Sequence, residues 1–304
     1  MAHWLSQPER GSKFLVRFIA WVGLRLGRPV GRLLLYPIAG YFLLTGRAAR
    51  NSSRAYLETL LGESVGLGQT FQHVLVFSQV TLDRIFFLTG QLGRFDIKVK
   101  GRRTIDELIE KREGCLLLGA HMGSFEALRA LGTFKRQLPI KILMYPQNSE
   151  RILEVLRTLN PEMASQVIQL GQTNTMIWAK QHVEEGGLLG LLGDRRVAGD
   201  KTFTVPFLGQ ETDLPAGPFL LASALKVQVI FFVCLYKGGN RYEIHLERLG
   251  DGVSPDRQNR EADLKKSVER YAQRLEAFCR ESPYNWFNFF DFWDQNPRRS
   301  DDRP

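Results

Sequence analysis

Two side chains that could share a proton lie five positions apart in this chain, His121 and Glu126. A neutral imidazole takes a proton from a hydroxyl or amine while that group attacks an activated acyl carbon. A carboxylate on one ring nitrogen fixes the tautomer and leaves the other nitrogen as the base. We therefore interpret His121 as a general base and Glu126 as the carboxylate that orients it. The alternative is that His121 caps a loop and Glu126 is a solvated acid suited to a helix N-terminus.

The elements around this pair decide whether the two side chains can meet. Residues 115–118 form a short apolar run, typical of a strand buried on both faces of a parallel sheet. Ser124 supplies N-cap chemistry ahead of a helical pattern that begins near Phe125. On one continuous helix five positions would separate the side chains. With His121 in the loop after the strand, and Glu126 in the first helical turn, we expect them to meet.

A second polar cluster follows another apolar run. Residues 186–193 predict a buried strand, and Asp194, Arg195 and Arg196 come directly after it. Since ligands of open α/β sheets bind beyond the carboxyl ends of the strands, we expect this cluster to converge with His121 on one crevice. The glycines form neither a P-loop nor a dinucleotide-binding fingerprint. The alternative is that Asp194 pairs with one arginine in a surface turn.

Residues 118–126, Leu-Gly-Ala-His-Met-Gly-Ser-Phe-Glu, resemble the first block of the lysophospholipid acyltransferase superfamily, with the glutamate typical of the lipid A late acyltransferases. Residues 193–196 and 202–209 resemble the third block and its sequel in that branch. Glycine replaces the proline expected before Asp194, and the Phe-Pro-Glu-Gly of phosphate-accepting relatives is missing, which argues against a glycerol-phosphate acceptor. Residues 9–12 and the aromatic end are also similar to the acyltransferases of aryl polyene clusters.

The resemblance implies catalysis by His121 and Glu126. It implies substrate binding by a larger set of residues: Asp194, Arg195, Arg196, Ser124, Asn148 and Arg151. The last two are assigned only because they lie where a second block is expected, and a solvated helix face is the alternative. The implied donor is an acyl thioester of acyl carrier protein or coenzyme A, and the implied acceptor is a hydroxyl of a lipid or glycolipid. No cofactor is implied.

Composition and spacing predict the fold class. We expect an α/β domain with a central, mostly parallel sheet flanked by helices, and the pattern of residues 227–236 and 241–248 predicts a hairpin. We divide the chain into a basic helical segment, residues 1–66, an acyltransferase domain, residues 67–296, and a disordered tail, residues 297–304. Residues 70–92 predict a strongly apolar helix that lines an acyl-chain groove or completes the core.

The chain carries a formal net charge of +9, and its first 54 residues hold nine basic residues but only one acid, Glu9. Aromatic and apolar residues alternate with these charges, a pattern typical of a segment at a membrane interface. Arginines at 17, 25, 28 and 32 interrupt the apolar run, so we expect an in-plane or re-entrant anchor on the cytoplasmic face of the inner membrane rather than a spanning helix. The alternative is a helix pair packed on the domain.

Other classes are disfavoured. We find no spacing typical of nucleic-acid modules, no Gly-x-Ser-x-Gly elbow and no metal-ligand pair, so we expect no nucleic acid partner and no metal. Three scattered cysteines predict reduced thiols. A catalytically inactive protein that binds the membrane surface remains the alternative to an enzyme.

Overall fold

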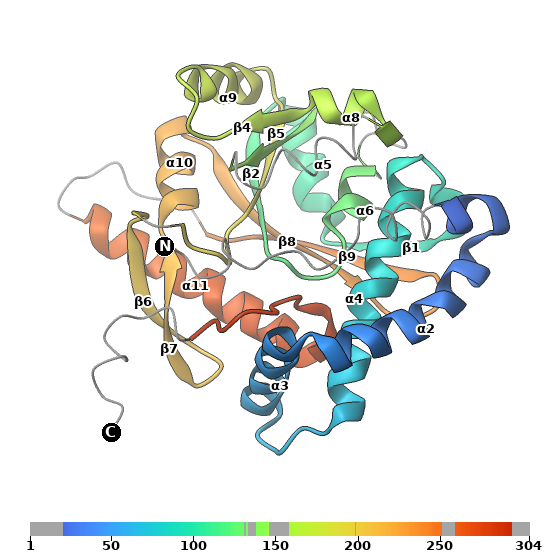
Figure 1. Ribbon diagram of the computed structural model, residues 1–304. Coiled ribbons are helices and arrows are strands. Elements are labelled where there is room, and N and C mark those ends of the chain that lie inside the picture. The colour runs from blue at the N-terminus through green and yellow to red at the C-terminus, as the bar shows by residue number, and fades with distance from the viewer. Residues whose placement is uncertain are drawn as a thin grey trace.

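The computed structural model describes residues 21–130, 132, 138–145, 158–197, 199–250 and 259–293. Seven strands form one sheet in the order β1-β9-β8-β2-β5-β3-β4, in which only β8 and β9 pair antiparallel (Figure 1). The strands are β1 (Asp96–Lys100), β2 (Cys115–Gly119), β3 (Ile140–Met144), β4 (Val167–Gln169), β5 (Leu188–Leu192), β8 (Gln228–Tyr236) and β9 (Arg241–Arg248). The predicted mostly parallel sheet and the hairpin of β8 and β9 are confirmed, and β1 pairs along the outer side of β9.

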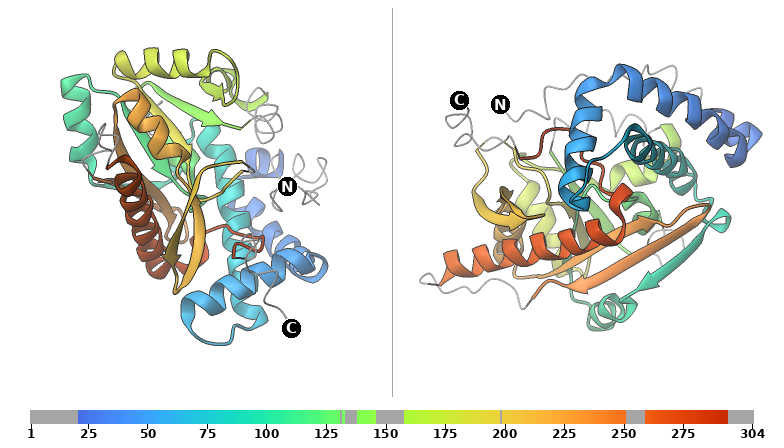
Figure 2. Two further views of the ribbon diagram at one scale, coloured as in Figure 1. Left: turned by 90° about the vertical axis from the view of Figure 1, so that its left-hand side faces the viewer. Right: turned by 90° about the horizontal axis from the view of Figure 1, so that it is seen from below.

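Helices cover both faces of this sheet (Figure 2). They are α2 (Arg28–Thr45), α3 (Arg47–Leu61), α4 (Leu67–Leu88), α5 (Arg102–Lys111), α6 (Phe125–Ala130), α8 (Pro161–Ser165), α9 (Thr175–Glu184), α10 (Gly217–Leu225) and α11 (Arg260–Glu281), with short 3-10 turns at Leu92–Arg94 and Pro283–Asn285. The sequence of β2 is continuously apolar because both faces of this strand are buried. Leu116 and Leu118 enter the core on the α11 side, whereas Cys115 and Leu117 enter the core on the α4 side.

A second, two-stranded antiparallel sheet was not predicted. It consists of β6 (Thr202–Phe207) and β7 (Gln210–Pro215) and packs against α11. Asp213 lies within β7, and the helix that follows, α10, begins at Gly217. The prolines at 206 and 215 concealed these strands, because proline is rare inside a sheet except at edges.

Two arginines of α2 point into the protein. Arg28 donates from Nε and Nη2 to the carboxylate of Asp83, at 2.6 and 2.8 Å, and Arg32 donates to the same carboxylate at 3.3 Å. Asp83 lies on α4, is fully buried, and also accepts the hydroxyl of Tyr242 at 2.8 Å. Arg28 and Arg32 are two of the arginines that interrupt the apolar run of the sequence. In the structure both bond to the one buried carboxylate of Asp83, so neither charge lies on the outer face of α2.

This cluster generates a prediction about stability. Asp83→Ala should lower the free energy of unfolding by roughly 3 kcal/mol, because it leaves two partly buried guanidinium groups without their carboxylate. Urea denaturation followed by circular dichroism measures the change. The control is Asp106→Ala, which removes a carboxylate paired with Arg102 on the surface of α5 and should cost less than about 1 kcal/mol. Equal losses in the two variants would contradict the assignment.

Candidate active site

The position of His121 follows from the register of two neighbouring strands. The parallel strands β2 and β5 pair with Gly119 opposite Leu192. His121 is two residues beyond Gly119, and Asp194 is two residues beyond Leu192. Both side chains therefore leave the sheet at the same edge, beyond the carboxyl ends of the strands. The predicted convergence of the two clusters is confirmed.

Asp194 holds His121 by two hydrogen bonds. The ring Nδ1 lies 2.8 Å from Oδ1, and the backbone N–H of His121 donates to Oδ2 at 3.0 Å. Because a carboxylate accepts the Nδ1 proton, the neutral ring keeps its lone pair on Nε2. The His121 side chain is 30% exposed, and within the described residues nothing hydrogen bonds to Nε2. The imidazole thus offers a basic nitrogen toward solvent.

Residues 283–293, here called the C-terminal strap, complete the surroundings of the pair. The indole N–H of Trp286 donates to Oδ2 of Asp194 at 2.9 Å. The backbone N–H of Phe287 donates to the carbonyl oxygen of His121 at 2.8 Å, and the Phe287 carbonyl accepts from Arg195 at 3.2 Å. The strap therefore fixes both the carboxylate and the backbone beside the imidazole.

The helices α3 and α4 hold the strap in turn. His73 of α4 lies 2.9 Å through Nε2 from the carbonyl oxygen of Trp286, and its Nδ1 lies 2.8 Å from the hydroxyl of Ser53 on α3. Nε2 must carry the proton, since a carbonyl only accepts. Burial lowers the pKa of His73 to about 4, so the ring is neutral near pH 7. A continuous chain of hydrogen bonds joins Ser53 to His121 through Trp286 and Asp194.

The charges of the site favour a neutral imidazole next to an ionised carboxylate. Burial opposes ionisation of Asp194, but His121, the positive charge of Arg195 and the Trp286 hydrogen bond outweigh it and hold the pKa of Asp194 well below its usual range. Burial and the charge of Arg195 lower the pKa of His121 from its ordinary 6.5, although Asp194 acts in the opposite direction. His121 is therefore ready to accept a proton near neutral pH.

Glu126 does not occupy the position that we expected. The carboxylate on Nδ1 of His121 belongs to Asp194, whereas Glu126 pairs through Oε1 with Nε of Arg84 on α4 at 2.8 Å. The turn between the two residues explains the difference. Gly123 has φ +63°, and the following N–H, of Ser124, donates to the carbonyl oxygen of Cys234 at 2.9 Å. This anchored turn starts α6, which packs on α4, and Glu126 there meets Arg84.

Of the predicted substrate-binding residues that the structure describes, Arg195 lies next to His121 and Asp194, whereas Arg196 and Ser124 bond to other side chains. Arg195 lies beside the pair, with its guanidinium over the ring of Phe290 at 5.2 Å. Arg196 instead pairs with Asp213 of β7 at 3.2 Å. Ser124 is buried and donates to Glu126 at 3.4 Å. Asn148 and Arg151 lie outside the described residues.

Two residues of the site escaped the sequence analysis, Trp286 and Arg84. Trp286 lies in the aromatic end of the chain, but nothing in the spacing of that segment indicates a bond to Asp194. Arg84 had no signal, because it lies within a helix that reads as a core element. Its charge acts on His121 and lowers the pKa of that ring further.

One group of side chains in the described part of the chain could ligate a metal: Glu243, His245 and Glu281. It shares no residue with the His121 site. Both glutamates already pair with lysines, Glu243 with Lys100 and Glu281 with Lys237, each at 3.0 Å. Because lysines already balance the charges of both carboxylates, we interpret this group as an ion-pair network and not as a metal site.

The sequence of the chain was compared with protein-family models and with curated proteins. Residues 4–294 match the family model described as bacterial lipid A biosynthesis acyltransferase. No curated protein matches the chain. The match spans the turn at His121, the turn at Asp194 and the C-terminal strap.

The electrostatics predict the titration of His121. NMR should give a pKa below 6.5 for this ring, and Arg195→Gln should raise it, because the variant removes a positive charge that disfavours the imidazolium. Asp194→Asn should lower it, because the stabilising negative charge is lost. The resonance of His182, which bonds to the carbonyl oxygen of Pro139 instead, is the internal control and should keep its pKa in both variants. A rise in Asp194→Asn would refute the pairing.

Proposed function

The chain belongs to the bacterial lipid A biosynthesis acyltransferases and is therefore an acyltransferase; we propose that it moves a fatty acyl chain from a thioester to a hydroxyl of a lipid or glycolipid. His121 is the general base in this proposal. The observation that supports it most directly is the partly exposed ring of His121, whose Nδ1 is held by Asp194. Such a ring has a fixed tautomer and one accessible basic nitrogen.

The reaction then needs two proton transfers. The acceptor hydroxyl gives its proton to Nε2 of His121 as its oxygen attacks the thioester carbonyl carbon. The C–S bond breaks when the tetrahedral intermediate collapses, and the leaving thiolate takes the proton back from Nε2. The products are an ester and a free thiol, with no net change at the protein. Asp194 stays ionised and stabilises the imidazolium between the two steps.

Negative charge on the thioester oxygen requires a partner that the loop backbone does not provide. The N–H groups of Met122, Gly123 and Ser124 are already donated to the carbonyl oxygens of Ala120, Asn285 and Cys234. The cations whose charges act on His121 are Arg195 and Arg84. We assign them to stabilise this oxygen or an anionic group of a substrate. Glu126 then acts indirectly, by holding Arg84 in place.

The donor in this proposal is acyl carrier protein or coenzyme A. Both are acidic partners, and the basic chain, at +9, attracts them. The acceptor in this proposal is a lipid or glycolipid that carries a hydroxyl. The enzyme and its lipid must meet at a membrane surface, which we place at the cytoplasmic face of the inner membrane.

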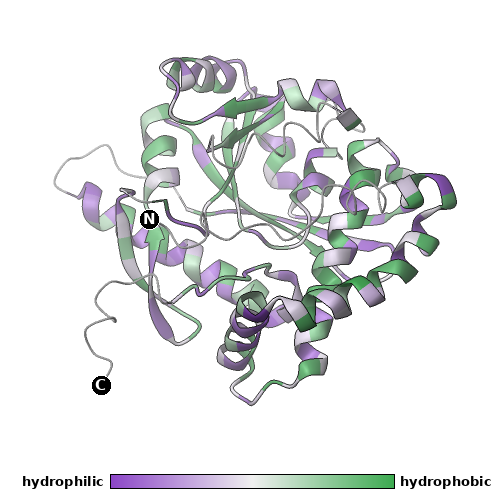
Figure 3. Ribbon diagram, viewed as in Figure 1, coloured by the Kyte–Doolittle hydropathy of each residue, from purple (hydrophilic) through white to green (hydrophobic). Residues whose placement is uncertain are grey.

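The surface of α2 supports such a membrane contact. Among the helices in the described part of the chain, none has both the length and the apolar character needed to span a bilayer. The outward side chains of α2 are nevertheless uncharged and apolar, and Figure 3 shows this helix as largely hydrophobic. The exposed large apolar side chains of α2 are those of Val30, Leu33, Tyr36, Tyr41 and Leu44. Because Arg28 and Arg32 point inward, this face suits a helix lying in the plane of the membrane.

Removal of the base should abolish turnover. His121→Ala should lower kcat/KM by roughly 10³-fold, and Asp194→Asn by a similar factor, because both remove the positioned base. Glu126→Gln should cost only about tenfold, since in this proposal it acts through Arg84. Release of free thiol from acyl carrier protein or coenzyme A thioesters measures the rates.

Circular dichroism and thermal melts show that each variant is folded before its rate is compared. An unchanged rate in folded His121→Ala would remove the proposed mechanism. A loss in Glu126→Gln as large as that in Asp194→Asn would restore a direct role for Glu126. A wild-type protein that consumes no thioester with any acceptor, yet binds vesicles, would identify the inactive alternative.

The apolar face of α2 can be tested without turnover. Leu33→Glu and Leu44→Glu, at positions 69% and 76% exposed, should each weaken binding to phospholipid vesicles by about tenfold or more. Their melting temperatures should not change, because neither side chain is part of the core. Ile109→Glu, an exposed apolar position on α5, is the matched control and should leave vesicle binding unaltered. Flotation with vesicles separates bound from free protein.

A further inference from the structure

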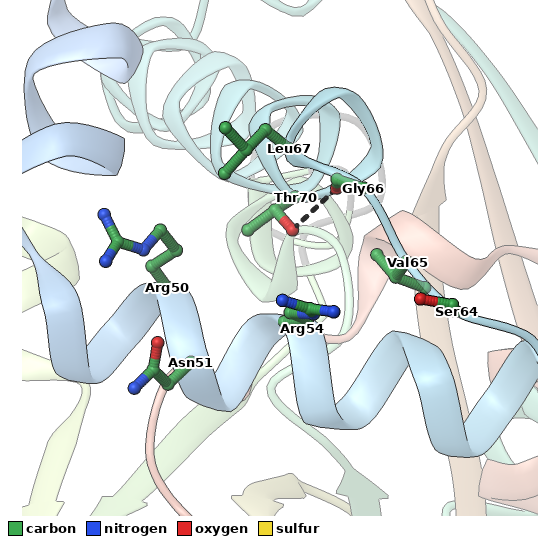
Figure 4. A pocket seen from close by; sticks show the side chains of 8 residues that line it. All are labelled: Arg50, Asn51, Arg54, Ser64, Val65, Gly66, Leu67 and Thr70. Atoms are coloured by element: carbon green, nitrogen blue, oxygen red, sulfur yellow. Dashed lines mark hydrogen bonds between the residues drawn. The ribbon is translucent and has the colours of Figure 1, made fainter.

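A basic cleft opens between α3 and the start of α4, on elements that contribute no residue directly bonded to His121. Its volume is about 730 Å³. Figure 4 shows the side chains that line it. The polar lining comes from Arg50, Asn51 and Arg54 of α3, Ser64 of the connecting loop and Thr70 of α4. Among the residues that the structure describes, no acidic side chain lines it.

Each arginine is anchored on one side. Arg50 donates from Nη1 to the carbonyl oxygen of Leu43, at the last turn of α2, at 3.1 Å. Arg54 donates from Nε to Glu58 at 2.8 Å, and the same carboxylate oxygen accepts the N–H of Val65 at 3.3 Å. One contact per guanidinium leaves further N–H donors of each group for the cleft. The two guanidinium groups that line the cleft can donate to an oxyanion with several acceptor oxygens, such as a phosphate.

The surroundings distinguish a lipid phosphate from a soluble one. The cleft is also lined by Leu67, whose side chain is 66% exposed at the start of α4. Arg50 contacts the turn of α2 that carries Leu44, which is part of the exposed apolar face. The basic groups thus lie at the edge of that face. In a membrane phospholipid, likewise, the anionic phosphate lies next to the apolar acyl chains.

We propose that this cleft binds the phosphate group of an anionic phospholipid while the apolar face of α2 enters the membrane. The cleft would then fix how the enzyme is oriented on the bilayer. The proposal rests on the membrane contact proposed above, but it is independent of the chemistry at His121.

The test compares two double variants that lose the same charge. Arg50→Gln/Arg54→Gln empties the cleft of guanidinium groups, and Arg102→Gln/Arg103→Gln removes two surface arginines of α5 that form similar i,i+4 ion pairs. Flotation uses phosphatidylcholine vesicles containing phosphatidylglycerol, and vesicles brought to the same surface charge with oleate. The cleft variant should bind the phosphatidylglycerol vesicles roughly twentyfold less well, and the α5 variant within about twofold of wild type. On oleate vesicles the two variants should not differ.

Three results would overturn the proposal. Equal losses in both variants would mean general charge attraction only. Competition by millimolar inorganic phosphate at constant ionic strength would identify a site for free phosphate. A loss of turnover on detergent-dispersed substrate in the cleft variant would place the cleft in the substrate site, since the proposal predicts unchanged turnover there. Failure of the His121 mechanism would not alter the vesicle results, so the two proposals fail separately.

Discussion

The buried carboxylate of Asp194 is the interaction on which the site depends. It is 2% exposed, and such a group remains charged inside a protein only when donors surround it. Its donors come from distant parts of the chain: the loop after β2, with both the backbone and the ring of His121, and the indole of Trp286. One carboxylate thereby joins the central sheet, the C-terminal strap and, through His73, the helices α3 and α4.

The sequence was sufficient for the parts of the site that depend on strand order. An apolar run followed by a polar turn occurs twice, at His121 and at Asp194, and parallel strands bring such turns to one edge. It was not sufficient for the partner of the imidazole. Spacing along the chain says little about direction when a glycine turn intervenes, and at Gly123 any Cβ would collide with the carbonyl oxygen of Cys234. Only glycine therefore fits at this position of the turn. The turn sets the direction of α6, and Glu126 in its first turn pairs with Arg84.

The same limit applies to the N-terminal helices. Pattern alone treats every arginine as a solvated charge, but Asp83, more than fifty residues away, draws Arg28 and Arg32 inward. Only the tertiary structure reveals that the outer face of α2 is free of charge. The strands β6 and β7 were missed for a related reason, because their prolines and acids resemble a loop until the hairpin is seen against α11.

The place of Trp286 in the chain has a consequence for biosynthesis. Translation proceeds from the N-terminus, so the sheet and the turns bearing His121 and Asp194 leave the ribosome before the indole that completes them. Until that residue emerges, the carboxylate lacks a donor and the loop lacks the backbone bond from Phe287. The hydrogen bonds around His121 and Asp194 are therefore complete only after the C-terminal strap has been synthesised.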